Sequence, residues 1–175
     1  TALYQMQFIG PPFTFGFRQL GTNCGAVGIN AAVDVNGIAY WMGNDSFFLF
    51  DGAVKKIPCS VQDYVFDDIN NNALGDVFCA VNSDFNEVIW FYPSKNSTQV
   101  DRNVTYNYAE KIWYIGTLAR SSWADRGVYS NPYAAEFEAS DTTATISTIN
   151  GVKEGRTFVY LHEEGVNDDG AAMNC

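Results

Sequence analysis

The sequence predicts an all-β fold: antiparallel four-stranded blades of a β-propeller, a partial one of two to three blades, with one short helix at about 60–71. Short runs rich in Val, Ile, Tyr, Phe and Trp recur along the chain, and turn-forming Asn, Asp, Ser and Pro separate them. Residues 77–118 contain four such runs in succession, which is the pattern of an antiparallel meander. Trp41 and Trp90 occupy comparable second positions of strand pairs, and the interval of 49 residues between positions 41 and 90 is typical of one repeat per blade.

The predicted elements begin with a strand at 1–10, which the Pro11-Pro12 pair ends. A second strand at 13–20 alternates three phenylalanines with Thr, Gly and Arg, so we expect it to be half buried. The glycine-rich segment 21–30 is a turn rather than a phosphate-binding loop, because no Gly-Lys-Ser/Thr ending and no clear helix follow.

A hairpin comes next, with strands at 37–43 and 46–52 that are apolar on both faces. Asn36-Gly37 precedes it and is a strong turn signal. When both faces of a sheet are apolar, we expect other parts of the protein to cover both of them, whereas a sheet with one solvent-exposed face alternates apolar and polar residues.

One helix is predicted, at Cys59–Asn72. Ser60 is the expected N-cap, and Asp63 stands three residues later as in a capping box. Its apolar face is formed by Val61, Tyr64, Val65 and Ile69. Asp67 and Asp68 near its C-terminus oppose the helix dipole, so tertiary packing must stabilise it.

The central meander decides the interpretation. Its predicted strands are Val77–Val81, Glu87–Tyr92, Asn103–Tyr108 and Lys111–Leu118. The second strand is apolar on both faces, as expected of a small sheet stacked between two similar sheets. The third alternates apolar and polar residues, so we expect it to be partly exposed.

The C-terminal part is predicted to begin a further unit. Residues 119–132 form a loop that contains Trp123, and strands follow at Pro132–Phe137 and Arg156–His162. The polar, Thr-rich segment between these strands has the signature of an insertion hairpin that turns at Asn150-Gly151. An acidic turn follows the last strand.

Composition restricts the class of function. The chain has 175 residues, of which 47% are hydrophobic, so residues 1–175 can bury a core and are predicted to be part of a single β-propeller domain, as a segment of a longer polypeptide. The net charge of −10 argues against a basic nucleic-acid-binding surface and against binding to an anionic membrane. It is compatible with a protein that DNA slides past, because an acidic surface repels phosphate. No apolar run reaches the roughly 18 residues of a transmembrane helix.

Metal sites are not predicted. The four cysteines have no Cys-x-x-Cys spacing and the chain has a single His, which argues against zinc. Their positions are Cys24, Cys59, Cys79 and Cys175. Four free thiols are the favoured state, and a disulfide such as Cys24–Cys59 stays open. Asp168 and Asp169 are adjacent, so the Asp-x-Asp-x-Asp-Gly spacing of a calcium loop is missing.

Catalysis is not predicted either. The sequence predicts no catalytic residue and no cofactor-binding residue. A glycosidase needs two carboxylates about 5–10 Å apart. The candidates are Asp45, Asp51, Asp84, Glu87, Glu163 and Glu164. All but Glu87 lie in turns or at strand ends, where solvated acidic residues are expected. His162 and Glu163 are adjacent in a predicted strand and therefore point to opposite faces.

A carbohydrate-binding face is the second class of function considered. The chain has 4 Trp, 10 Tyr and 13 Phe, and Trp123 in its predicted loop is the first candidate for an exposed sugar platform. Packing of aromatic residues between blades is the favoured alternative. Three glycosylation patterns, at Asn44, Asn96 and Asn103, matter only in a eukaryotic secretory context.

Several segments together resemble a known family: AYWMGNDSFFLFDGAVKKIPCSVQDYVFDDIN, VNSDFNEVIWFYPS, NYAEKIWYIGTLARSSWADRG and YLHEEGVNDDG. They are similar to the propeller-bearing tail hub or nozzle proteins of short-tailed bacteriophages, the packaged-DNA-stabilising type. The resemblance covers about residues 35–170. Its motifs are aromatic strands and turn residues, so they specify a fold family better than an activity.

The resemblance implies a non-enzymatic virion part without a cofactor. Its expected partners are other copies of itself in a ring, tail adaptor and portal-side proteins, tail fibres or spikes, and phage DNA in transit, with no membrane. The implied location is the phage tail, where acidic loops would line the path of the DNA. The alternative is a carbohydrate-binding or glycosidase-like β-propeller.

Overall fold

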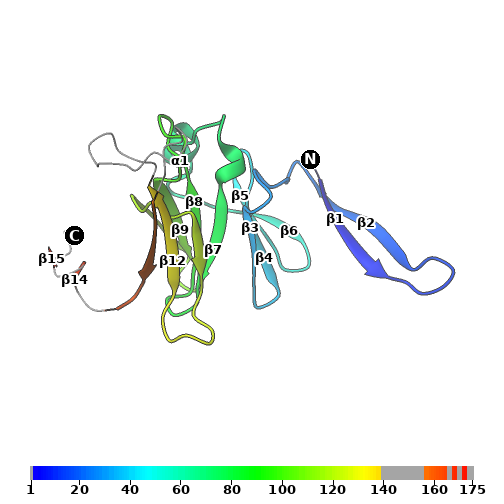
Figure 1. Ribbon diagram of the computed structural model, residues 1–175. Coiled ribbons are helices and arrows are strands. Elements are labelled where there is room, and N and C mark those ends of the chain that lie inside the picture. The colour runs from blue at the N-terminus through cyan, green and yellow to red at the C-terminus, as the bar shows by residue number, and fades with distance from the viewer. Residues whose placement is uncertain (1, 139–155, 165–166, 169–170, 173–175) are drawn as a thin grey trace, which may run out of the picture. The chain divides into compact units, whose positions relative to one another are not determined.

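The computed structural model describes residues 2–138, 156–164, 167–168 and 171–172, and it confirms the all-β prediction: these residues form antiparallel sheets and a single short α-helix (Figure 1). The chain divides into two compact units, an N-terminal unit, Thr1–Ala119, and a C-terminal unit, Arg120–Cys175. The prediction of one propeller domain over the whole chain stays a prediction.

Two four-stranded meanders form the body of the N-terminal unit. The first sheet has the order β3 (Ala32–Val35), β4 (Ile38–Met42), β5 (Phe47–Phe50), β6 (Val54–Ile57). The second has the order β7 (Phe78–Asn82), β8 (Glu87–Tyr92), β9 (Arg102–Asn107), β10 (Ile112–Gly116). The predicted central meander is therefore confirmed. Trp41 and Trp90 each lie in the second strand of their sheet, so their positions are comparable.

The main hydrophobic core takes side chains from one face of each of these two sheets and from the helix between them. Phe47 of β5 reaches across to the second sheet, where its ring centroid lies 4.9 Å from that of Trp90 and 4.6 Å from that of Trp113. The indole of Trp90 donates a hydrogen bond to the Ala31 carbonyl, 3.1 Å away, just before the first sheet. Aromatic packing and this hydrogen bond together join the two sheets.

A smaller core covers the other face of the first sheet. Trp41 stacks on Phe48 with ring centroids 5.6 Å apart, and its indole donates to the Cys24 carbonyl at 2.6 Å. Leu3 and Val54 pack against this cluster. Both faces of the first sheet therefore pack against apolar side chains, as the sequence predicted.

The exposure of the second sheet differs from the prediction. Strand β9 is buried, with Asn103 at 8% and Thr105 at 1% of their exposed area, although its polar alternation indicated a partly exposed strand. The two side chains satisfy each other in part, because the Asn103 amide donates to the Thr105 hydroxyl at 3.2 Å. The edge strand β10 is the exposed one instead.

The helix α1 (Gln62–Asp68) lies where the sequence placed it but is shorter, and a 3-10 turn, η1 (Leu74–Asp76), follows. The predicted Ser60 cap is wrong. The N-cap is Val61, and no side chain makes a capping hydrogen bond at the N-terminus of the helix. Tyr64 is half exposed rather than part of the apolar face, whereas Val65 is fully buried. Burial of one face in the core stabilises the helix. This is the tertiary packing that we expected, because Asp67 and Asp68 oppose the helix dipole.

An N-terminal hairpin completes this unit, formed by β1 (Ala2–Phe8) and β2 (Phe15–Thr22). Both strands were predicted. The expected half burial of the second strand is wrong, because Phe15 is 51% exposed and Phe17 is 72% exposed.

The C-terminal unit has a three-stranded sheet in the order β11 (Ser122–Ala124), β12 (Tyr133–Glu138), β13 (Arg156–Leu161). A two-stranded pair, β14 (Asn167–Asp168) and β15 (Ala171–Ala172), follows. The two longer strands were predicted. Trp123 lies in β11 rather than in a loop, which corrects the sequence prediction. The expected insertion hairpin at Asn150-Gly151 lies outside the described residues.

Candidate functional site

The N-terminal hairpin presents one largely apolar face, on which Gln19 is the polar member and accepts a hydrogen bond from the Tyr4 hydroxyl at 3.2 Å. In the register of β1 with β2, Met6 lies opposite Phe17 and Phe8 lies opposite Phe15, so these side chains share a face with Tyr4. We call this set the hairpin face: Tyr4, Met6, Phe8, Phe15 and Phe17. Each member is between 51% and 72% exposed.

The opposite face of the hairpin is more polar, although the half-exposed Ile9 side chain lies against Gly16 on it. Gln7 lies opposite Gly16, and Gln5 lies opposite Arg18. The hairpin is held by its backbone ladder, by the bond from the Ile9 amide to the Thr14 carbonyl at 3.2 Å, and at its base by Leu3 in the smaller core. Apart from Gln19 and Ile9, apolar and polar residues are thus segregated as in a strand pair that covers a core, but this apolar face is exposed.

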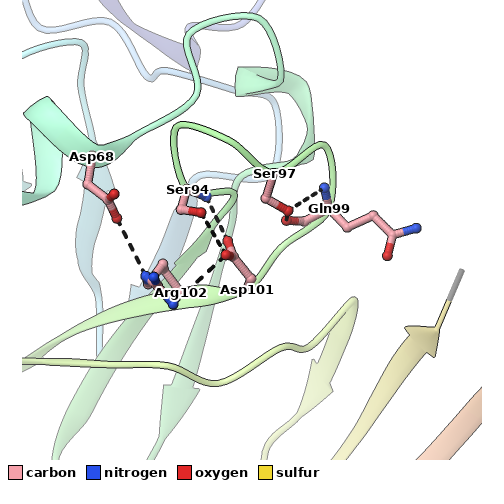
Figure 2. A network of polar contacts seen from close by, with 6 residues as sticks. All are labelled: Asp68, Ser94, Ser97, Gln99, Asp101 and Arg102. Carbon is pink, nitrogen blue, oxygen red and sulfur yellow. Dashed lines mark hydrogen bonds and ion pairs between the residues drawn. The ribbon is translucent and has the colours of Figure 1, made fainter. Parts of the chain in front are cut away.

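A polar network lies at the C-terminal end of α1 (Figure 2). The Asp101 carboxylate accepts hydrogen bonds from the Ser94 amide at 2.7 Å and from the Ser94 hydroxyl at 2.6 Å. Arg102 lies between two carboxylates, with Nε 3.6 Å from Asp68 Oδ2 and Nη1 3.9 Å from Asp101 Oδ2. These contacts tie the loop before β9 to the helix. Asp101 thus accepts two hydrogen bonds and also lies within ion-pair distance of Arg102, so its place in the structure is that of a loop-fixing carboxylate.

Tyr92 adds a buried hydroxyl close to this network. Burial first, and then the Asp68 carboxylate, hold the pKa of Tyr92 well above its ordinary value, so the phenol stays neutral. The hydroxyl makes no hydrogen bond within the part of the chain that the structure describes.

An open cavity of about 540 Å³ lies beside the same helix end. Its lining is rich in amides and is formed by Phe66, Asp67, Ile69, Asn70, Asn71, Asn72, Lys95 and Asn96. Asn70 is itself fixed, because its amide donates to the Ser97 carbonyl at 2.7 Å. Amides, one carboxylate and one ammonium beside an aromatic ring are groups that can bind sugar hydroxyls.

The C-terminal unit contains a cluster around a buried arginine. Arg120, 9% exposed, pairs with Glu136 at 2.9 Å and donates from Nε to His162 Nε2 at 3.0 Å. Its guanidinium also lies over the Tyr160 ring, 4.1 Å from the centroid. The His162 ring packs against Trp123 with centroids 4.6 Å apart. One cation therefore contacts the paired strands β12 and β13, and His162 links it to Trp123 of β11.

Accepting a hydrogen bond from Arg120 requires His162 to be neutral at Nε2. Burial first, and then the Arg120 charge, lower the pKa of His162 to about 4. The histidine is therefore a fixed acceptor near neutral pH and does not serve as an acid–base group there.

We expect His162 to make the stability of the C-terminal unit depend on pH. In the unfolded chain its pKa is about 6.5. Between that value and the folded value of about 4, the unfolded state binds more protons, so the stabilisation is complete above 6.5 and is lost as the pH falls towards 4. Because solvent screens a half-buried ring, we expect the pH-dependent part of the unfolding free energy to be about 1–2 kcal/mol.

The matched variant is His162→Gln, which keeps an acceptor at the end of the side chain but does not titrate. Hydrogen exchange at pH 7.5 and pH 5 measures the protection of the β12 and β13 amides. On going from pH 7.5 to pH 5, this protection should fall more in the wild type than in the variant. Equal pH dependence in the two proteins would contradict this role for His162.

Three of the carboxylates that the sequence offered for catalysis contact different donor groups. Asp45 lies 4.0 Å from the Lys56 ammonium, and Asp51 bonds to Lys55 at 2.5 Å, which lowers the pKa of Asp51. Glu87 accepts a hydrogen bond from the Tyr114 hydroxyl. Each of these three carboxylates thus faces a donor of its own.

The other predicted candidates are exposed. Asp84 is exposed in the turn before β8, and Glu163 and Glu164 are exposed after β13. The His162 ring faces Arg120 and Trp123, so it belongs to the arginine cluster. Within the described ranges, no group of three or more His, Cys, Asp and Glu side chains is placed to hold a metal ion.

Cys24, Cys59 and Cys79 are free thiols, so the open alternative of a Cys24–Cys59 disulfide is wrong. Burial raises the pKa of Cys59 to about 11, which leaves this thiol protonated and unreactive near neutral pH. Cys175 lies outside the described residues.

Of the three glycosylation patterns, Asn44 and Asn96 are exposed, whereas Asn103 is buried in β9. A glycan at Asn103 is incompatible with this fold. Among the helices that the structure describes, none has the length and apolar character needed to cross a membrane.

Sequence reasoning missed both the hairpin face and the arginine cluster. The alternation of Phe13, Phe15 and Phe17 was the available signal for the first, but it was interpreted as burial. For the second, the sequence offered no local signal, because Arg120, Glu136 and His162 come from separate segments.

No protein-family model matches the chain, and a search of curated proteins finds no match. The resemblance to phage tail proteins therefore stays a prediction.

Proposed function

We propose that this chain is a non-enzymatic structural part of a short-tailed bacteriophage, a portion of the β-propeller of a tail hub or nozzle protein. In this role it acts by assembly. It joins other copies in a ring, contacts the adaptor or portal-side proteins and the fibres or spikes, and surrounds the path of DNA during ejection.

The observation that carries the proposal is the pair of like sheets in the N-terminal unit. Two consecutive four-stranded meanders share one core, and their first strands, β3 and β7, are neighbours. The Cys79 amide donates to the Asn30 carbonyl at 2.8 Å, which fixes the start of one sheet against the start of the other. Successive blades of a propeller are related in this way, with their first strands around the axis.

Charge supports the same role. The net charge of −10 gives a surface that does not retain DNA, because like charges repel phosphate along a channel. The exposed hairpin face supplies an apolar surface for assembly.

The test is cryo-electron microscopy of phage particles that carry this chain. We expect its paired four-stranded sheets in the tail, below the portal, with acidic loops towards the DNA path. Absence of the chain from purified virions, or a position on the outside of the tail with the acidic loops facing away from the lumen, would contradict the proposal.

A carbohydrate-binding or glycosidase-like propeller is the second candidate, and the amide-lined cavity beside α1 favours it. A glycan array, followed by an assay of the bound sugars for hydrolysis, tests this alternative. Binding that Asn71→Ala or Lys95→Ala abolishes would favour it over the structural role.

A further inference from the structure

The hairpin face is a large apolar surface on an acidic chain. Its five side chains are exposed together on a single face of a two-stranded ribbon. A two-stranded hairpin is marginally stable alone in water, and contiguous exposed aromatic residues mark interaction sites. We propose that this face is a homotypic contact: the hairpin face of one copy packs on the hairpin face of a second copy of this chain.

The distribution of charge along the chain permits a second copy as the occupant. Each copy carries a net charge of −10, so repulsion opposes self-association unless the contact surface is free of carboxylates. The first acidic residue of the chain is Asp34, and Arg18 is the one charged residue before it. Arg18 lies opposite Gln5 on the polar face, so the hairpin face itself carries no charge. Two such faces meet without bringing like charges together.

The area is sufficient for a specific contact. An aromatic side chain offers about 150–250 Å² for burial, and roughly half to three quarters of each hairpin-face side chain is still exposed, so one copy contributes roughly 500–700 Å². Two copies together bury about 1,000–1,400 Å², which reaches the lower range of stable protein interfaces.

Geometry also suits this pairing. Both partners are twisted two-stranded ribbons, and two sheets of the same hand pack face to face with interdigitating side chains. The contact is isologous, so it joins copies in pairs and does not by itself close a ring. It is a property of the chain alone, so its failure in solution and a failure of the proposed tail role are separate results.

Sedimentation velocity of the whole chain from about 1 to 100 μM tests the contact, with Met6→Glu and Gln7→Glu as a matched pair. The two variants introduce the same charge at neighbouring positions of β1 that point to opposite faces. The wild type should form dimers, Met6→Glu should weaken dimerisation at least 100-fold, and Gln7→Glu should change it less than about threefold. Far-ultraviolet circular dichroism checks that each variant is folded, and Phe17→Ser provides an uncharged second test.

A complementation experiment identifies the surface on the second copy. Met6→Glu and Met6→Lys should each be monomeric alone, and an equimolar mixture of the two should dimerise, because opposite charges then meet across the contact. Raising the salt concentration should tighten the wild-type dimer, since it screens the repulsion between the acidic copies. A monomeric wild type at 100 μM, equal effects of Met6→Glu and Gln7→Glu, or a mixture that stays monomeric would each overturn the proposal.

Discussion

Phe47→Ala should lower the free energy of unfolding of the N-terminal unit by about 3–5 kcal/mol. Phe47 is fully buried, and its ring contacts Trp90 and Trp113 of the second sheet and Phe66 of α1, at centroid distances of 4.9, 4.6 and 5.5 Å. Truncation leaves a cavity between two sheets and a helix, which cannot collapse without moving one of them. The effect therefore belongs at the high end for a single side chain.

Urea denaturation followed by tryptophan fluorescence measures this loss, since Trp90 and Trp113 border the cavity. Phe85→Ala is the control: Phe85 is 50% exposed in the turn before β8, and its truncation should cost less than about 1 kcal/mol. A loss below about 1 kcal/mol for Phe47→Ala would show that the two sheets are not held by this contact.

The sequence predicts the strands of the N-terminal unit well because their identity depends on local signals. After Glu87, the run Glu87–Tyr92 is β-branched and aromatic, and the structure has β8 with the same bounds. Asn36-Gly37 predicted the tight turn, and both residues have the positive φ, 53° and 82°, that this turn requires. Strand order then follows from short connections.

Burial is harder to predict, because alternation tells which side chains share a face but not what covers that face. The Phe residues of β2 and the Asn and Thr residues of β9 show the problem in opposite directions. Phe15 and Phe17 alternate as a core face would, yet they are exposed. Asn103 and Thr105 alternate as a wet face would, yet they are buried and bond to each other. Only tertiary neighbours decide such cases.

The helix cap shows a further limit. Ser60 followed by Asp63 has the spacing of a capping box, but the helix starts at Gln62 without a side-chain cap. Val65 and Ile69 bury one face in the core, and the Asp68 carboxylate lies near Arg102 of β9. These long-range contacts determine the helix bounds more strongly than the local cap.

Arg120→Met should destabilise the antiparallel pair of β12 and β13 in the C-terminal unit by about 2–3 kcal/mol. The change removes the 2.9 Å ion pair with Glu136 and the 3.0 Å hydrogen bond to His162, and it leaves two polar groups without the cation they share. Glu136 retains 20% exposure, so water offsets part of the loss. Amides of β12 and β13 should exchange roughly 30-fold faster or more, while those of the N-terminal unit keep their protection.

The double variant Arg120→Met/Glu136→Gln separates the two causes of that loss. Replacing the carboxylate removes the buried unpaired charge, so the double variant should regain part of the protection lost in Arg120→Met. Arg120→Lys should rescue little, because one ammonium cannot bond to Glu136 and His162 and also stack on Tyr160. In Arg120→Met the pKa of His162 should rise from about 4, since the Arg120 charge contributes to its lowering, and proton NMR of the single imidazole reports this directly. Unchanged exchange in Arg120→Met, or an unchanged His162 pKa, would mean that Arg120 does not organise this sheet.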